Sequence, residues 1–364
     1  MPGPISAVDS VSPAFADTRR MLFAPWKFGM WWRMSVLGLL TGEFASGGFS
    51  GSPNFRFPQQ NRRLLASLVP LHSEIPDWVR QNWIWLALCG ILLVALFCIA
   101  EYLASVSRFV LLDAVVSGRC EIRAQWRKWR RQGVRYFFWD IGFALACVVV
   151  LLLLIGIPLW SFIKKIPSGA NPNWGALLAG GLLVFLGVAV FLVLVGVVDL
   201  FARDFLIPVM AMENCGVWAG WRRVKQLLGG ERLACTGYVL MKIVLAMGSA
   251  ILFGVVDLVV LLLLLIPIGL VAIATYFIFL RMNLTWSVGT VSGVCIEVAL
   301  AIAVISWACA FVYSPGLVFF QSYALRFFAS RFPALDAAMN PAPQTPAGFI
   351  PSGPLPQPPF SSSP

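Results

Sequence analysis

The chain contains few charged residues. Asp, Glu, Lys and Arg together make up 12% of its 364 residues, whereas soluble domains carry about 25%. Hydrophobic residues make up 59%, and the mean hydropathy is +0.84. Because a soluble fold could not cover so much apolar surface, the composition argues against an ordinary soluble domain. It predicts an all-α, polytopic membrane protein.

Residues that commonly carry catalysis or bind metals are also scarce. The chain has one histidine, and its eight cysteines include no CxxC pair. Zinc sites need clustered His and Cys ligands, and disulfide frameworks need regularly spaced cysteines. The motifs GxSxG and HExxH are missing as well. We therefore expect no metal, no cofactor and no catalytic residue, and a function other than catalysis.

The charge that is present is mostly positive. The net charge is +11 at pH 7, which in a soluble chain would suggest a nucleic-acid partner. In a membrane protein the same excess is typical of positive-inside topology and of contact with anionic headgroups. The predicted partners are therefore membrane lipids, with an unidentified membrane protein as a further candidate, and no nucleic acid.

Five regions are apolar and long enough to cross a bilayer as a helix, which takes about 20 residues. They are residues 83–100, 137–162, 176–198, 238–266 and 291–313. A sixth span is predicted at residues 31–44, mainly because both termini then lie on the side of the basic loops. Residues 267–280 are compatible with a re-entrant segment, an extension of the preceding helix, or a seventh span.

Basic loops indicate the orientation of the chain. Residues 119–135 and 222–232 are basic and are separated by two spans, so the positive-inside rule assigns both to the cytoplasm. Basic residues near the two ends assign both termini to the same side. We expect a multi-pass protein of a bacterial cytoplasmic (inner) membrane.

Three regions are predicted along the chain. They are a cytoplasmic interfacial segment at residues 1–30, a helical membrane domain at residues 31–332, and a Pro-rich tail at residues 333–364. The tail should be disordered and solvated, with a ligand for a Pro-binding partner as the alternative. The N-terminus lacks the pattern of a cleaved signal peptide.

One basic segment occurs twice, 95 residues apart. Residues 120–133 read CEIRAQWRKWRRQG, and residues 215–230 read CGVWAGWRRVKQLLGG. In the first copy Ile122, Trp126 and Trp129 fall on one helical face, and the matching positions of the second copy are also apolar. Each copy is therefore predicted to form an amphipathic helix in the membrane surface, with Trp at the lipid boundary.

The two copies predict a tandem repeat whose units begin near residues 108 and 203. Because two spans separate the copies, the units are parallel. The basic side chains of both copies are expected to bind anionic lipid headgroups. They are Arg123, Arg127, Lys128, Arg130, Arg131, Arg222, Arg223 and Lys225.

Several charged residues interrupt the apolar runs, where an unpaired charge costs at least about 2.5–3.5 kcal/mol. Asp199 and Arg203 are four residues apart and are predicted to pair, whereas Asp204 should point elsewhere. Lys242 fits a snorkelling residue, with a place in a polar pathway together with Asp257 and Glu297 as the alternative. The remaining two, Asp257 and Glu297, are compatible either with a polar pathway or with a structural role.

Several short motifs resemble a group of uncharacterised bacterial six-span membrane proteins. The motifs include RRMLFAPW, RFVLLDAVVSGR, DFLIPVMAMENCGVWAGWRRVKQLL and PGLVFFQSYALRFF. This group is similar to the membrane domain fused to some glycerophosphodiester phosphodiesterases. The present chain lacks the soluble catalytic domain of those enzymes, and the resemblance implies no mechanism.

Two hypotheses follow from the sequence. The first is a non-enzymatic membrane scaffold, assembly or regulatory protein whose basic helices dock on anionic lipid. The alternative is a transporter or channel for a small or amphipathic solute, with Asp257 and Glu297 in its path.

Overall fold

A computed structural model describes residues 6–24, 26, 28–42, 77–165, 174–282 and 288–340. These residues form helices and no strand. In chain order the elements are α1 (Val11–Leu22), α2 (Phe28–Thr41), α5 (Asp77–Ser117), α6 (Ile122–Lys165), α7 (Trp174–Phe201), the π-helical turn η2 (Ala202–Leu206), α8 (Ile207–Glu213), α9 (Val217–Leu228), α10 (Arg232–Arg281), α11 (Val288–Ala329) and α12 (Pro333–Met339). The all-α prediction is confirmed.

Five helices are long and apolar enough to cross a membrane, which supports a multi-pass membrane protein. These candidate spans lie in α5, α6, α7 with η2 and α8, α10, and α11. The sixth predicted span is not among them. Its described part forms α2, which has 14 residues and is therefore about 21 Å long, short of the roughly 30 Å hydrocarbon core.

The apolar run at residues 267–280 extends the preceding helix. Helix α10 continues through Pro267 to Arg281. Proline removes one backbone hydrogen bond and usually bends a helix, but the apolar side chains on both sides keep the helix favourable in lipid. Among the three alternatives, the structure therefore selects the extension.

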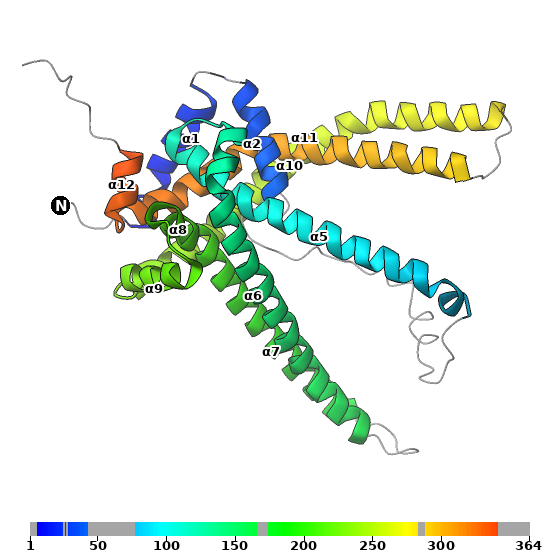
Figure 1. Cartoon of the computed structure of the whole chain (residues 1–364), viewed down its shortest axis with the longest axis horizontal. Helices are drawn as coiled ribbons and strands as arrows, with labels where there is room; N and C mark the ends of the chain where they lie inside the picture. The colour runs from blue at the N-terminus through cyan, green and yellow to red at the C-terminus, as the bar shows by residue number, and fades with distance from the viewer. Residues whose placement is uncertain are drawn as a thin grey trace, which may run out of the picture.

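The molecule has a compact head from which three apolar prongs diverge (Figure 1). The head comprises α1, α2, η2, α8, α9 and α12, together with the adjoining ends of the five long helices. One prong is α5, the second pairs α6 with α7, and the third pairs α10 with α11. The two described ends of the chain both lie at the head.

The core of the protein lies in the head. Its centre is an aromatic cluster in which the ring of Tyr238 stacks on Phe327 at 4.6 Å and on Tyr323 at 5.3 Å. Phe205 and Phe328 complete this cluster. Such pairs add about 0.5–1.5 kcal/mol each beyond the area they bury. The chain thus holds the helices together mainly at one end.

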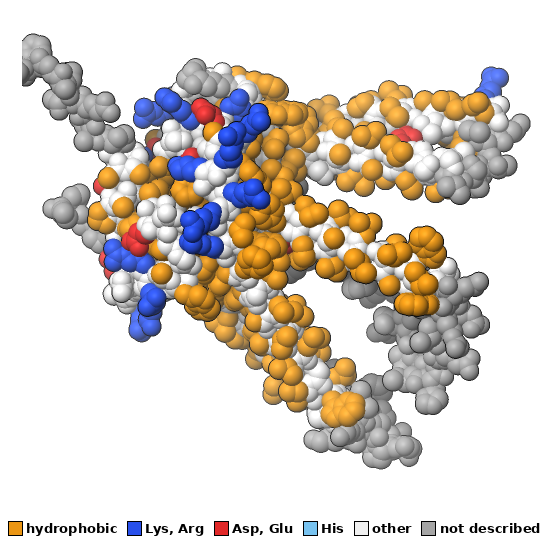
Figure 2. Space-filling view, in the orientation of Figure 1, with side chains coloured by type: hydrophobic (Ala, Val, Ile, Leu, Met, Phe, Trp, Pro, Cys, Tyr) orange, Lys and Arg blue, Asp and Glu red, His pale blue; other side chains and the backbone are white. Residues whose placement is uncertain are grey.

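The prongs expose hydrophobic side chains along their length on the face that Figure 2 shows. Leu183 on α7 and Ile251 on α10 are 73% and 71% exposed. A helix that is apolar all round is stable where lipid surrounds it, because its backbone groups bond within the helix. The prongs therefore hold the candidate membrane-crossing segments.

The C-terminal tail begins later than predicted. Residues 333–339 form α12, and Leu335 is fully buried against the head. Proline is tolerated in the first turn of a helix, so Pro333 starts this helix instead of preventing it. The Pro-rich remainder, residues 341–364, lies outside the described residues.

Candidate functional site

The two basic segments fold differently. The first copy, from Ile122 onward, is the beginning of α6 and continues into its span without a break. The second copy is α9, a separate helix that ends at Gly229. The Gly229–Gly230 pair explains this difference, because glycine favours helix termination, whereas the first copy has Val134 and Arg135 at the following positions.

The apolar stripes of both segments face the protein core. Trp129 is 8% exposed and stacks on Phe109 of α5, with ring centroids 6.1 Å apart. In α9, Val224 and Leu228 are buried in the head. The prediction that the stripe tryptophans reach the lipid boundary is therefore wrong for Trp129, which neighbouring helices cover, whereas Trp126 and Trp221 are only partly buried. The exposed tryptophan is instead Trp218, beside the stripe of α9.

The basic side chains lie on the exposed surface of the head. Lys and Arg gather there and are sparse on the prongs (Figure 2). Lys128 donates to Asp113 at 2.7 Å, and Arg223 donates to Glu213 at 2.8 Å. Both pairs are partly exposed, and such pairs contribute about 0–1 kcal/mol. All eight predicted headgroup-binding residues are exposed, and we call them the basic face: Arg123, Arg127, Lys128, Arg130, Arg131, Arg222, Arg223 and Lys225.

Two recesses open on the basic face. The first, about 550 Å³, lies beside α9 and combines an apolar lining that includes Trp218 with the cationic residues Arg222, Lys225 and Arg232. This combination of apolar wall and cationic edge is the chemistry that an anionic amphiphile requires.

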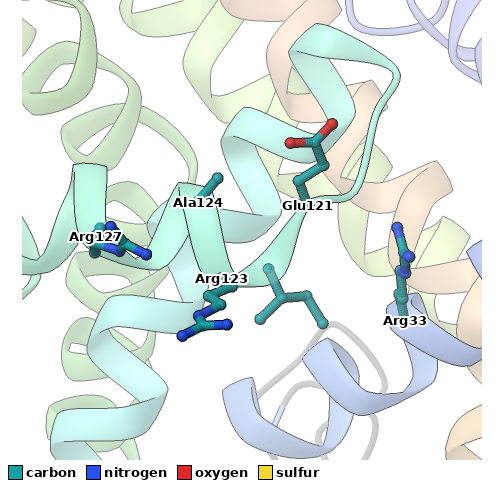
Figure 3. Close-up of a pocket in the computed structure, with 6 residues that line it drawn as sticks. Arg33, Glu121, Arg123, Ala124 and Arg127 are labelled. Carbon is teal, nitrogen blue, oxygen red and sulfur yellow. The ribbon is translucent and has the colours of Figure 1, made fainter.

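The second recess, about 670 Å³, lies between α2 and the start of α6. Figure 3 shows Arg123 and Arg127 on the first turns of α6 and Arg33 on α2 opposite them. Arg33 donates to the Cys120 carbonyl at 2.5 Å. Sequence reasoning missed Arg33, because this residue lies within the sixth predicted span at residues 31–44.

Asp204 and Lys242 form a buried ion pair at the junction of η2 and α10. Their charged atoms are 2.5 Å apart, and both side chains are 7% exposed. The Tyr238 hydroxyl donates to the same Asp204 oxygen at 2.7 Å. As predicted, Asp199 and Arg203 pair with each other, at 2.8 Å. Asp204 takes no part in that pair and binds Lys242 instead. The snorkelling prediction for Lys242 is wrong, since its ammonium group is paired within the protein.

A second cluster has the same arrangement with the charges reversed. Arg108 of α5 lies 3.2 Å from Asp140 and 3.4 Å from the Tyr136 hydroxyl, both on α6. The long helix that follows supplies Tyr136 and Asp140 here, and Tyr238 and Lys242 in the other cluster. Each pair is four residues apart, so one helical face presents both side chains. This spacing is the sequence signal for the two side chains that each long helix contributes, but it does not indicate their partner on the other helix.

The structure does not bring Asp257 and Glu297 together. Asp257 lies on α10 close enough to Cys309 of α11 for an electrostatic interaction. Glu297 is twelve residues from Cys309 along α11, which corresponds to about 18 Å of helix. The buried Oδ1 of Asp257 has no hydrogen-bond partner among the described residues. The two carboxylates therefore do not form one site.

The cysteines next to the basic segments are poor nucleophiles. Burial raises the pKa of the Cys120 thiol to about 11, although nearby Arg33 acts in the opposite direction. Burial also raises the pKa of Cys215. Both thiols are therefore protonated at neutral pH. Within the described ranges, His, Cys, Asp and Glu form no group of three that could hold a metal ion.

Comparison with known families gives one match. Residues 5–338 match a family of unknown function, DUF7544. The chain belongs to this family. It matches no curated protein and no solved structure.

The family assignment agrees with only part of the sequence-based resemblance. An uncharacterised family is confirmed, and its match covers the head and all three prongs. No relation to the membrane domain of glycerophosphodiester phosphodiesterases is found.

Proposed function

We propose that this protein is a non-enzymatic scaffold, assembly or regulatory component of a membrane, and that its basic face docks on an anionic lipid leaflet. The observation that carries the proposal is the recess beside α9, where exposed Arg222 and Lys225 border an apolar wall that includes Trp218. Each basic residue near an anionic surface contributes about 1 kcal/mol. Anionic lipid headgroups are the proposed partners, together with an unidentified membrane protein.

In this proposal, the basic face docks on the cytoplasmic leaflet of a bacterial inner membrane. Support comes from the excess of Lys and Arg at the head, which is where the positive-inside rule predicts cytoplasmic loops. The described ends of the chain, in α1 and α12, also belong to the head, so both termini are proposed to be cytoplasmic.

We further propose that the membrane domain is a tandem parallel repeat. Two observations support this besides the 95-residue spacing of the basic segments. Lys128 and Arg223, which occupy matching positions, each pair with an acid from the element that precedes the segment. The charge-reversed clusters around Tyr136 and Tyr238 also join matching elements.

Alkaline phosphatase fusions test the orientation. Phosphatase is active only outside the cytoplasm, so fusions within residues 166–173, between α6 and α7, are expected to be active. Fusions between Arg123 and Arg135 should be inactive although expressed at the same level. Activity at the second position would reverse the proposed orientation.

Neutralising the cations of α9 tests the lipid-docking proposal. The full chain carrying Arg222→Gln, Arg223→Gln and Lys225→Gln is expected to lose about tenfold or more of its enrichment for phosphatidylglycerol over phosphatidylcholine. Enrichment is measured by mass spectrometry of the lipids that copurify from mixed bilayers, at low and high salt. Arg281→Gln, at the far end of α10, is the control and should change nothing. Unchanged enrichment in the triple variant would contradict the proposal.

A second candidate function, a transporter or channel, rests on Asp257. A buried carboxylate oxygen without a partner within a span is typical of a pathway for ions or protons. In this case Asp257→Asn, with or without Glu297→Gln, should abolish proton or K⁺ flux in proteoliposomes, and the α9 triple variant should leave it intact. If proteoliposomes with wild-type protein show no proton or K⁺ flux, and those with the Asp257 variant show none either, this candidate function fails for these ions.

A further inference from the structure

An apolar groove of about 710 Å³ lies between α1 and the α10–α11 prong. Its volume falls in the range of about 300–1,000 Å³ that is typical of ligand pockets. Phe15 of α1 and Phe23, which directly follows α1, line one side, and Leu252 of α10 and Phe319 of α11 line the other. On α10 the groove begins at Val244, two residues after the buried Lys242. The apolar surface of the prong starts at the same point.

The walls of the groove are held in place by the head. Asp17 of α1 accepts two hydrogen bonds from Arg326 of α11, at 2.7 and 2.8 Å. This bidentate geometry fixes both distance and orientation. On α11, Gly316 lets the helix approach α10 closely, because a Cβ there would lie 2.8 Å from the Phe253 ring. The groove is therefore preformed.

One polar group in the groove is available to a ligand. The hydroxyls of Thr18 and Ser249 donate to carbonyls of their own helices, at 2.8 and 2.9 Å. Arg19 is exposed at the edge, and its guanidinium group forms no ion pair or hydrogen bond with another described residue. The groove thus offers a long apolar surface and a single cation.

We propose that this groove holds one acyl chain of an anionic phospholipid, with the phosphate on Arg19. The groove opens on the apolar prong, so a chain can enter from the bilayer without crossing water. It offers almost no hydrogen-bonding groups for a peptide backbone, whereas a guanidinium group suits a phosphate geometrically. The inference rests on the proposed lipid docking but concerns a single retained lipid at a different place, away from the basic face.

The experiment blocks the groove and removes its charge separately. A Cβ at Gly248, inside the groove, would meet no protein atom within 4 Å, so Gly248→Leu should fill the groove without disturbing its walls. Gly254, on the same helix, is equally open and does not line the groove. Arg19→Gln removes the charge, and Arg20→Gln is its control because Arg20 borders another recess.

Native mass spectrometry of the full chain, delipidated and then given phosphatidylglycerol, phosphatidylcholine or oleate, measures the bound lipid. We expect wild type to retain one phosphatidylglycerol, and Gly248→Leu to lower its affinity about tenfold or more. Arg19→Gln should lose the preference for phosphatidylglycerol over phosphatidylcholine. Gly254→Leu and Arg20→Gln should match wild type, and far-UV circular dichroism checks that each variant is folded.

Two results would overturn the inference. One is a Gly248→Leu variant that binds phosphatidylglycerol as wild type does. The other is equal binding of phosphatidylcholine or oleate by wild type, which would make the site a general apolar groove. The α9 triple variant distinguishes the two proposals: it should lose bulk lipid enrichment and still retain the single lipid. Unchanged bulk enrichment in the triple variant, with the single lipid still retained, would refute docking by the basic face and leave the groove site standing.

Discussion

Replacing Asp204 with Asn is expected to lower the free energy of unfolding by about 3–5 kcal/mol, because it leaves a buried cation without its counter-ion. The Lys242 ammonium group lies 2.5 Å from the Asp204 carboxylate, and both side chains are almost fully buried. Asparagine keeps the size of the side chain but not its charge. It also weakens the acceptor of the Tyr238 hydroxyl in the aromatic core.

The measurement is a titration of the purified chain with sodium dodecyl sulfate, in which circular dichroism monitors unfolding. Asp199→Asn is the matched control, because the Asp199–Arg203 pair lies one turn away and is partly exposed. Its loss should cost only about 0.3–0.5 kcal/mol. Replacing both buried partners, as Asp204→Leu with Lys242→Met, should restore most of the stability. If the two Asn variants were equally stable, the buried pair would not have the proposed energetic role.

The second large effect is expected at Gly133, where α6 crosses α5. A methyl group there would lie 2.5 Å from Cγ2 and 2.9 Å from Cα of Val106. Because one of these contacts is with backbone, a side-chain rotation cannot relieve it, and the two helices must move apart. Gly133→Ala should therefore lower the free energy of unfolding by about 1–3 kcal/mol.

A second glycine of α6 provides the control. A Cβ at Gly142 would meet nothing within 4 Å, so Gly142→Ala should gain up to about 1 kcal/mol from the higher helix propensity of alanine. The two substitutions are chemically identical and should change stability in opposite directions in the same detergent titration. A stabilised Gly133→Ala variant would show that α5 and α6 are not in close contact at this point.

Much of the candidate site could be predicted from local sequence. The alternation of apolar and basic residues at helical spacing identified α9 and the start of α6, and all eight predicted cations are exposed. The Asp199–Arg203 pair was predicted for the same reason, since its partners lie on one turn of one helix. Periodicity indicates which face of a helix is apolar, but not which neighbour covers that face. Trp129 was therefore assigned to the lipid boundary although protein buries it.

Contacts between distant segments could not be predicted. Asp204 and Lys242 are 38 residues apart, and Asp17 and Arg326 are 309 apart. Periodicity within a helix contains no information on either pairing. The same applies to Arg33, which faces the start of α6 because α2 packs against α5 and α11 in the head.

By itself, the sequence determined that the chain is helical, that it has several segments long and apolar enough to cross a membrane, and that its positive charge gathers on a few segments. Composition and helical spacing are local properties. The free-energy cost of exposing an apolar side chain to water scales with its own apolar area, so long apolar runs are recognised without knowledge of the fold. Tertiary structure alone decided that a short segment joins the head, that two charge-reversed clusters join separate helices, and that α1 forms a groove with α10 and α11. These features depend on which helices meet and how closely, because packing is a property of surfaces that come from distant parts of the chain.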